Sequence, residues 1–259
     1  MKVAIIAIAK NEQLYLQEWL DYHLQLGFDK IIVADNDDTL LLSGFSSENV
    51  IIEDYTGIDK VQSKAYTELF SKYRNDYDWI AFFDIDEFLV LDGCTDVKEF
   101  LSNYDADEVK LNCMHFTDGD ELDVVDGDYS VFRRFVYAAD SPDLNRFSKA
   151  FINCRIKASF KAIYGHGIYD KGVNAVDVLG NKILPCDRKT RNKLFVKGWF
   201  NHYPTKTIGE YIRQKYYRGG PNGNPRRYTD WEDYFFRTNT RTEEKVEYAK
   251  RIINELTIS

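Results

Sequence analysis

Apolar residues in the first hundred positions come in short unbroken runs, and helically spaced segments separate these runs. The runs predict buried strands at residues 3–9, 30–34, 50–52 and 79–83. Segments 14–24 and 60–73 carry apolar side chains at helical spacing and predict helices. Asn11 is the expected N-cap of the first helix, and Gly27 the residue that ends it. Strands alternating with helices indicate βαβ units and a mostly parallel sheet.

Beyond residue 91 the apolar pattern is less regular, with short alternating segments joined by turns rich in Asp and Gly. It predicts strands at 108–113 and 130–136, a helix at 207–217, a loop at 219–225 and an amphipathic helix at 243–254. No internal repeat or low-complexity linker divides the chain, so residues 1–259 are expected to form one α/β domain. Residues 1–100 would be its nucleotide-binding half, and residues 101–259 a mixed portion with C-terminal helices.

Length and composition predict the size of the core and the location of the protein in the cell. A chain of 259 residues with 44% hydrophobic content can bury a sizeable core. Residues 3–9 are too short an apolar run for a signal peptide, and no run approaches the ~20 residues of a membrane span. We therefore expect a cytoplasmic protein. Its four cysteines form no C-x-x-C pair, so neither a zinc ribbon nor a redox motif is predicted.

The net charge of −8 conceals a strong asymmetry along the chain. Residues 1–130 hold 29 acidic and 9 basic residues, whereas residues 131–259 hold 13 acidic and 25 basic residues. Two interpretations are compatible. The halves can attract each other across an internal interface, or an acidic half can hold a metal while a basic half holds phosphate or an anionic membrane. No nucleic-acid reading module accompanies the basic half, so nucleic acid is not an expected partner.

Asp84 and Asp86 follow the run 79–83 two residues apart. If the strand continues, both carboxylates point to one face, and such oxygen ligands suit Mg²⁺ or Mn²⁺. Polar residues also follow the first two strands, at 10–12 and 35–36, and parallel strands would bring all three ends to one edge. The alternative is a pair of solvated acids. No glycine-rich phosphate loop is present, so a bound diphosphate would need a metal and cationic side chains.

Several of these segments together resemble a known class of enzymes. They are the runs IAIAKNEQLYLQEWLDYHLQLGFDKIIVADND and WIAFFDIDEF, then residues 116–119 and 129–135, and finally NHYPTKTIGEYIRQKYYRG. The chain resembles bacterial glycosyltransferases of the family 2 kind and the related family 92 group over about four fifths of its length. The resemblance implies a GT-A-type fold, a nucleotide-diphospho-sugar donor with UDP as the expected nucleotide, and Mn²⁺ or Mg²⁺.

The resemblance also implies roles for residues at the strand ends. Asp84 and Asp86 match the D-x-D motif, with Asp86 as the direct metal ligand and Asp84 nearer the ribose or a metal-bound water. Asn11, Glu12 and Asp35 match nucleoside-contacting positions, although Asn11 and Glu12 can equally cap the first helix. His202 matches a late histidine that would be the third metal ligand. Its alternative role is that of a hydrogen-bonded core residue.

The diphosphate of the donor would be bound by three basic residues, Lys206, Lys215 and Arg218. On a helix Lys215 and Arg218 are neighbours at i and i+3, but a solvated basic face would look the same in sequence.

A carboxylate near residue 118 is the expected general base. Asp118 is the first candidate, and Asp120 and Glu121 are rivals; Asp118 before a glycine is also a typical Asx-turn residue. A calcium-loop interpretation of this stretch fails because an aspartate stands where the loop needs glycine.

The implied activity is an inverting sugar transfer to a glycan or lipid-linked glycan in bacterial surface polysaccharide assembly. Two other classes stay open. One is a nucleotidyltransferase or phosphohydrolase that uses the same D-x-D metal, and the other a non-catalytic sugar-nucleotide-binding module with aromatic platforms. The basic and aromatic residues between 226 and 241 would suit a peripheral membrane contact or a dimer surface.

Overall fold

The structure is a computed structural model that describes residues 1–59, 61–124, 127–185, 188–190, 192, 194–216 and 231–258. Its strands are β1 (Val3–Ala9), β2 (Lys30–Asp35), β3 (Val50–Asp54), β4 (Trp79–Asp84), β5 (Glu87–Leu91), β6 (Glu108–His115), β7 (Ser148–Asn153), β8 (Ile163–Tyr164), β9 (Gly167–Ile168), β10 (Ala175–Asp177) and β11 (Gly198–His202). Its α-helices are α1 (Gln13–Gln25), α2 (Gln62–Tyr73), α3 (Val97–Leu101), α4 (Val131–Arg134), α5 (Ile208–Tyr211), α6 (Trp231–Phe235) and α7 (Glu243–Ile258). Short 3₁₀ helices occupy Ser43–Phe45 and Leu144–Arg146, and a π-helix, Ile212–Tyr216, continues α5.

The chain divides into two compact units. The first comprises Met1–Met114 and Pro142–Asn201, and the second comprises His115–Ser141 and His202–Ser259. Both are built from two separate stretches of sequence. The expectation of a single domain over residues 1–259 stays a prediction.

The first unit is organised around one sheet. Across the described residues nine strands take part, in the order β3-β2-β1-β4-β7-β6-β11-β5, with β10 pairing to β6. The pairs β1–β2, β1–β4, β2–β3 and β6–β10 are parallel, whereas β7 is antiparallel to both β4 and β6. This order confirms the predicted α/β class with a mostly parallel sheet.

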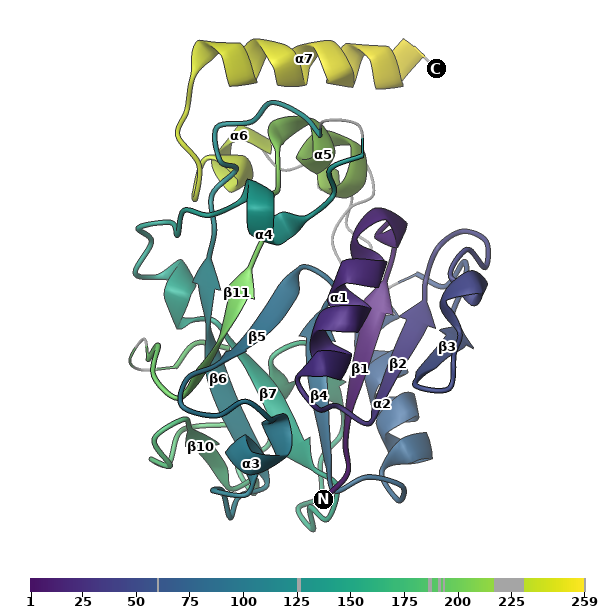
Figure 1. The fold of residues 1–259 in the computed structure, drawn as a ribbon, viewed down its shortest axis with the longest axis vertical. Coiled ribbons are helices and arrows are strands. Elements are labelled where there is room, and N and C mark those ends of the chain that lie inside the picture. Colours follow the sequence, from purple (N-terminus) through teal and green to yellow (C-terminus); the bar gives the residue numbers. More distant parts are fainter. Residues whose placement is uncertain are drawn as a thin grey trace. The chain divides into compact units, whose positions relative to one another are not determined.

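Helices cover both faces of the central strands, and β4 shows why its sequence is apolar throughout. The Phe82 ring contacts Tyr66 and Phe70 of α2, at centroid distances of 5.1 and 6.2 Å. The next residue, Phe83, points to the other layer and contacts His23 of α1 at 5.6 Å. In Figure 1, α1 lies in front of the strands of this part of the sheet. A strand buried on both sides has no polar face to show, which explains the unbroken run.

The strands and helices predicted for residues 1–84 are confirmed to within one or two residues at their described ends. The capping prediction for α1 is wrong in one respect. Glu12, not Asn11, stands at the N-cap and makes no side-chain cap bond, while Asn11 takes the left-handed conformation with φ 57°. Gly27 ends α1, as predicted. Its φ of 90° favours glycine, and a side chain at this position would also collide with Asp96.

Residues 130–136 were predicted as a strand, and that prediction is wrong: the short helix α4 occupies 131–134. The segment alternates apolar and charged residues, but Ser130 is extended before the helix and Arg134 is buried by ion pairs rather than exposed. The buried arginine therefore breaks the assumption that charged positions face water. The predicted 219–225 loop lies outside the described residues.

The second unit has a small core of its own. Ile208 and Tyr211 of α5 and Phe235 of α6 pack with Ala249 and Ile252 of α7, all of them almost fully buried. The predicted amphipathic helix at 243–254 is confirmed and continues to Ile258. The predicted helix at 207–217 corresponds to α5 and the π-helix up to residue 216. None of the helices in the described part of the chain is long and apolar enough to span a bilayer.

Candidate functional site

Three carboxylates converge where β4 ends and β5 begins. Asp84 is the last residue of β4, Ile85 and Asp86 form a turn, and Glu87 opens β5. One oxygen from each of Asp84, Asp86 and Glu87 lies within 4.8 Å of the others. The predicted strand continuation through Asp86 is wrong, because β5 leaves β4 and joins the far end of the sheet. The turn, not strand alternation, brings the two aspartates together.

The register of the sheet places the other predicted strand ends at the same edge. Ala9 of β1 pairs with Asp35 of β2, and Ile8 pairs with Asp84 of β4. Because these strands are parallel, their carboxyl ends lie side by side. The predicted convergence of the three strand ends is therefore confirmed.

Asp84 is held by side chains from two elements. Its Oδ1 accepts from Gln62 Nε2 at 3.3 Å and Tyr66 OH at 3.4 Å, both on α2. Its Oδ2 lies 2.5 Å from Lys149 Nζ on β7. About one third of the Asp84 side chain is exposed, so this carboxylate stands at the boundary between core and surface.

Glu87 completes the cluster and was not singled out from the sequence. Its Oε2 accepts from the backbone N–H of Asp84 at 3.0 Å and lies 3.0 Å from Lys149 Nζ. The side chain is 1% exposed. The available signal was its position directly after D-x-D, since an acid inside an otherwise apolar run needs a buried partner.

Lys149 is the partner that no sequence spacing could reveal. It lies on β7, and its side chain is 3% exposed. Burial alone would lower its pKa, but the charges of Asp84 and Glu87 outweigh it and hold the pKa of Lys149 well above its ordinary value. A buried ammonium therefore sits permanently charged among the carboxylates.

The β8–β9 turn lies next to this cluster. A side chain at Gly165 would meet Gln62, which contacts Asp84. His166 donates from Nδ1 to the carbonyl of Ser148 at 2.8 Å, since a carbonyl can only accept. Burial and the charge of Lys149 lower the pKa of His166 to about 4, so its imidazole is neutral at pH 7. Sequence reasoning missed this histidine as well.

The acids at the ends of β1 and β2 mainly organise the loop backbone. Asp35 is fully buried and accepts from the N–H groups of Asp37 and Leu42, at 3.1 and 2.8 Å. Asp37, also buried, accepts from the N–H of Asn11 at 2.6 Å. Burial raises the pKa of Asp37. Glu12 is 6% exposed beside these loops. The nucleoside contacts expected of Asn11, Glu12 and Asp35 stay predictions.

His202, the predicted third metal ligand, belongs to the second unit. Its Nδ1 lies 3.1 Å from Nε2 of His115, and the ring centroids are 4.7 Å apart. His115 is almost fully buried and was not identified from the sequence. A paired histidine is what the alternative interpretation expected, and the role of His202 as a metal ligand stays a prediction.

Asp118 lies in the second unit in a tightly bonded turn. Its Oδ1 accepts from the N–H of Asp120 at 3.1 Å, and its Oδ2 lies 2.7 Å from Lys245 Nζ. Its own N–H donates to Asn239. Asp118 is 1% exposed, whereas the side chain of Asp120, also paired with Lys245, is 81% exposed. Burial raises the pKa of Asp118, and Lys245 opposes this rise. The Asx turn proposed as the alternative role is present.

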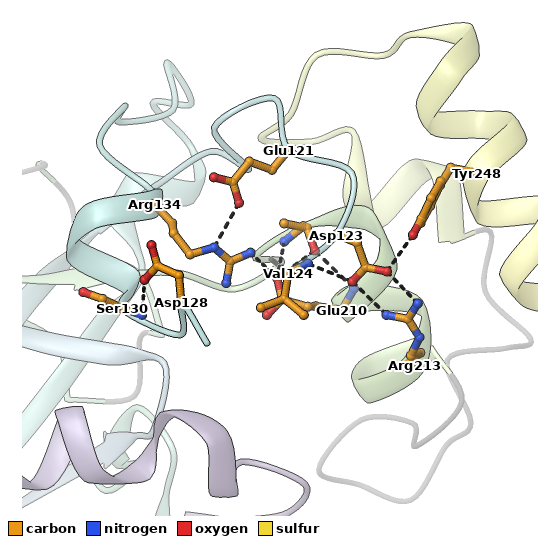
Figure 2. Close-up of polar contacts among 10 residues, drawn as sticks. Glu121, Asp123, Val124, Asp128, Ser130, Arg134, Glu210, Arg213 and Tyr248 are labelled. Carbon is orange, nitrogen blue, oxygen red and sulfur yellow. Dashed lines mark hydrogen bonds and ion pairs between the residues drawn. The ribbon is translucent and has the colours of Figure 1, made fainter. Parts of the chain in front are cut away.

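Glu121, the remaining candidate base, belongs to an ion-pair network centred on Arg134 (Figure 2). Arg134 donates from Nε to Glu121 and from a terminal nitrogen to Glu210, both at 2.9 Å. Glu210 also forms a capping box at the start of α5, in which Thr207 is the N-cap and Glu210 the N3 residue. In the same view, Asp123 accepts from Arg213 and Tyr248.

The predicted diphosphate-binding cations have different outcomes. Lys206 is 2% exposed and takes the left-handed conformation with φ 52° just before α5. Lys215 is 7% exposed in the π-helix. Neither forms the solvated basic face of the alternative interpretation. Arg218 lies outside the described residues, and diphosphate binding by all three stays a prediction.

The chemistry of the acidic cluster fits a hard divalent cation. Asp84, Asp86 and Glu87 supply carboxylate oxygens, which Mg²⁺ and Mn²⁺ prefer. The cluster also stands at the carboxyl end of a parallel strand, where α/β sheets bind their ligands.

Comparison with known proteins identifies the family. The sequence profile of glycosyltransferase family 92 matches residues 3–216, and the chain belongs to this family. A family 92 protein of rice, Oryza sativa subsp. japonica, is 26% identical over 123 residues, which are 44% of this chain and 21% of the relative. One from Ricinus communis is 22% identical over 125 residues, covering 44% and 23%. The chain thus spans about a fifth of the length of these relatives.

A solved structure was also compared with the chain. Residues 1–349 of TarS from S. aureus, in complex with UDP-GlcNAc, align with 50% of this chain and 37% of that chain, at 15% identity and a TM-score of 0.34. A TM-score this low does not establish a shared fold. The family 92 part of the predicted resemblance is confirmed, whereas the family 2 part and a bacterial origin stay predictions.

Proposed function

We propose that this chain is a metal-dependent glycosyltransferase that uses a nucleotide-diphospho-sugar, with UDP as the expected nucleotide. The observation that carries the proposal is the convergence of Asp84, Asp86 and Glu87 at the carboxyl end of β4 in a family 92 chain. A bound Mn²⁺ or Mg²⁺ would supply positive charge to the leaving nucleoside diphosphate. Asp86 is the proposed direct ligand, and the GT-A-type fold and His202 as a further ligand belong to the same proposal.

The proposed reaction is a single displacement with inversion. The acceptor hydroxyl oxygen attacks the anomeric carbon, the bond to the diphosphate oxygen breaks, and the hydroxyl proton passes to a carboxylate. Lys206, Lys215 and Arg218 would bind the diphosphate, and Asn11, Glu12 and Asp35 would bind the nucleoside. The acceptor would be a glycan or lipid-linked glycan, and bacterial surface polysaccharide assembly is the proposed setting.

The base is proposed to come from residues 118–121. Asp118 was the first candidate, but its Oδ1 accepts from Asp120 within the turn and its Oδ2 pairs with Lys245 of α7. Asp120 and Glu121 extend from the same turn and are more exposed. We therefore propose that Asp118 fixes the turn and that one of its two neighbours accepts the proton.

The test is a panel of nucleoside-diphospho-sugars followed by NMR with the purified protein, once with Mn²⁺ and once with EDTA. We expect slow hydrolysis or line broadening of one donor in the sample with Mn²⁺ and neither effect in the sample with EDTA. If free nucleotides or other phosphate esters respond and no sugar donor does, the nucleotidyltransferase or phosphohydrolase class replaces this proposal. If a donor binds but is never turned over with any acceptor, a binding module replaces it.

A further inference from the structure

Lys149 stands out because it brings a permanent positive charge into a site that would bind a cation. Its Nζ lies 2.5 Å from Asp84 Oδ2 and 3.0 Å from Glu87 Oε2. The lysine and glutamate side chains are 3% and 1% exposed, so the ammonium cannot reach water. A buried ammonium needs neighbouring negative charge, and the two carboxylates need a cation just as much.

The ammonium does structurally what a metal does in many acidic clusters. It links the end of β4 to the start of β5 through one oxygen of each acid. The backbone N–H of Asp84, which donates to Glu87, closes the same turn. This arrangement keeps Asp84 and Glu87 together without requiring a divalent ion.

We propose that Lys149 is a positioning residue that replaces the metal as the structural counter-ion of the cluster and thereby weakens metal binding. The metal is then needed for the donor and not for the fold. Repulsion between an ammonium and a divalent ion a few ångströms apart favours reversible binding. The inference rests on the proposed function for the identity of the donor, but its test does not depend on sugar transfer.

The experiment compares Lys149→Met with the wild-type chain, using electron paramagnetic resonance to measure Mn²⁺ binding and thermal unfolding with EDTA or Mn²⁺. Wild-type unfolding should be nearly the same in EDTA and in Mn²⁺. Lys149→Met should unfold several degrees lower in EDTA, recover in Mn²⁺, and bind Mn²⁺ on the order of tenfold more tightly because the repulsion is gone. Lys161→Met, which removes an exposed positive charge of the same unit, should behave as wild type.

Equal or weaker Mn²⁺ binding by Lys149→Met overturns the inference, as does a wild-type chain that loses several degrees of stability in EDTA. The wild-type measurement decides the matter even if Lys149→Met does not fold. Tighter binding by Lys149→Met together with no donor hydrolysis by the wild type would keep this inference and remove the proposed function. Donor hydrolysis with equal Mn²⁺ affinity of the two chains would do the reverse.

Discussion

At the scale of single residues, burial decides the behaviour of the charged groups. Lys149, Glu87 and Arg134 are all nearly inaccessible, and each is matched by an opposite charge. Sequence identified the D-x-D acids because both lie within three positions of each other. It could not identify Lys149, because the partner of a buried acid is set by strand pairing between β4 and β7 across more than sixty residues.

Glu108 gives a pH dependence that can be measured. This first residue of β6 is fully buried, and burial raises its pKa from 4.5 to about 7. The folded chain therefore holds a proton that the unfolded chain releases, so the stabilisation is complete below pH 4.5 and is lost as pH rises to 7. At ~1.4 kcal/mol per pH unit, the loss is roughly 3 kcal/mol.

Glu108→Gln mimics the protonated acid and should remove this loss. Its free energy of unfolding, relative to wild type, should rise by roughly 3 kcal/mol between pH 4.5 and pH 8 in urea titrations. The exposed Asp105→Asn, just before β6, is the matched control and should follow the wild-type curve. A constant difference between Glu108→Gln and wild type across this range would show that Glu108 is not protonated in the folded chain.

Asp118→Asn separates a structural role from a catalytic one. Loss of the charge facing Lys245 should lower the free energy of unfolding by about 2 kcal/mol, less than for an isolated buried pair because Asp120 still contacts the lysine. If Asp120 or Glu121 is the base, converting that residue to its amide should slow transfer by ~10²–10⁴-fold. For the exposed Asp120 this loss should come with little change in stability. An Asp118→Asn chain of unchanged stability that loses transfer to this extent would make Asp118 the base.

At the scale of elements, the apolar pattern predicts the first unit well. The central strands β1, β2 and β4 are each buried on both faces, so the sequence of each strand must be largely apolar. The break between β4 and β5 was not predictable in the same way, because FFDIDEFL keeps one pattern through the turn. In the second unit, the helix α4 was not predicted, because the charged residue Arg134 is buried by ion pairing.

Arg134→Met tests whether the ion-pair network holds the second unit together. The change leaves Glu210 buried without its arginine, so we expect a loss of ~3–5 kcal/mol in the free energy of unfolding. Arg133→Met removes the neighbouring exposed arginine and should stay near the wild-type value. Chemical unfolding of both variants measures the difference. Equal stability of the two would mean that the capping box of α5 suffices to hold Glu210.

At the scale of the whole molecule, the charge asymmetry follows the chemistry proposed for each part. The acidic first 130 residues contain the carboxylate cluster, and the basic remainder contains Lys206 and Lys215. Arg226 and Arg227 of the segment 226–241 lie outside the described residues, and the predicted peripheral membrane contact stays a prediction. The family follows from the sequence profile, whereas donor sugar, acceptor and linkage depend on pocket shape and are not written in residue patterns.

The most direct test of a metal-dependent transferase is the hydrolysis of its donor by Asp86→Asn, measured by NMR with Mn²⁺ and with EDTA. Asp38→Asn is the matched control, since its carboxylate is 92% exposed near the same sheet edge. We predict Mn²⁺-dependent hydrolysis by wild type and Asp38→Asn, and a rate at the EDTA background for Asp86→Asn, because a direct metal ligand is lost. Full Mn²⁺-dependent hydrolysis by Asp86→Asn would contradict the assignment of this cluster as the metal site.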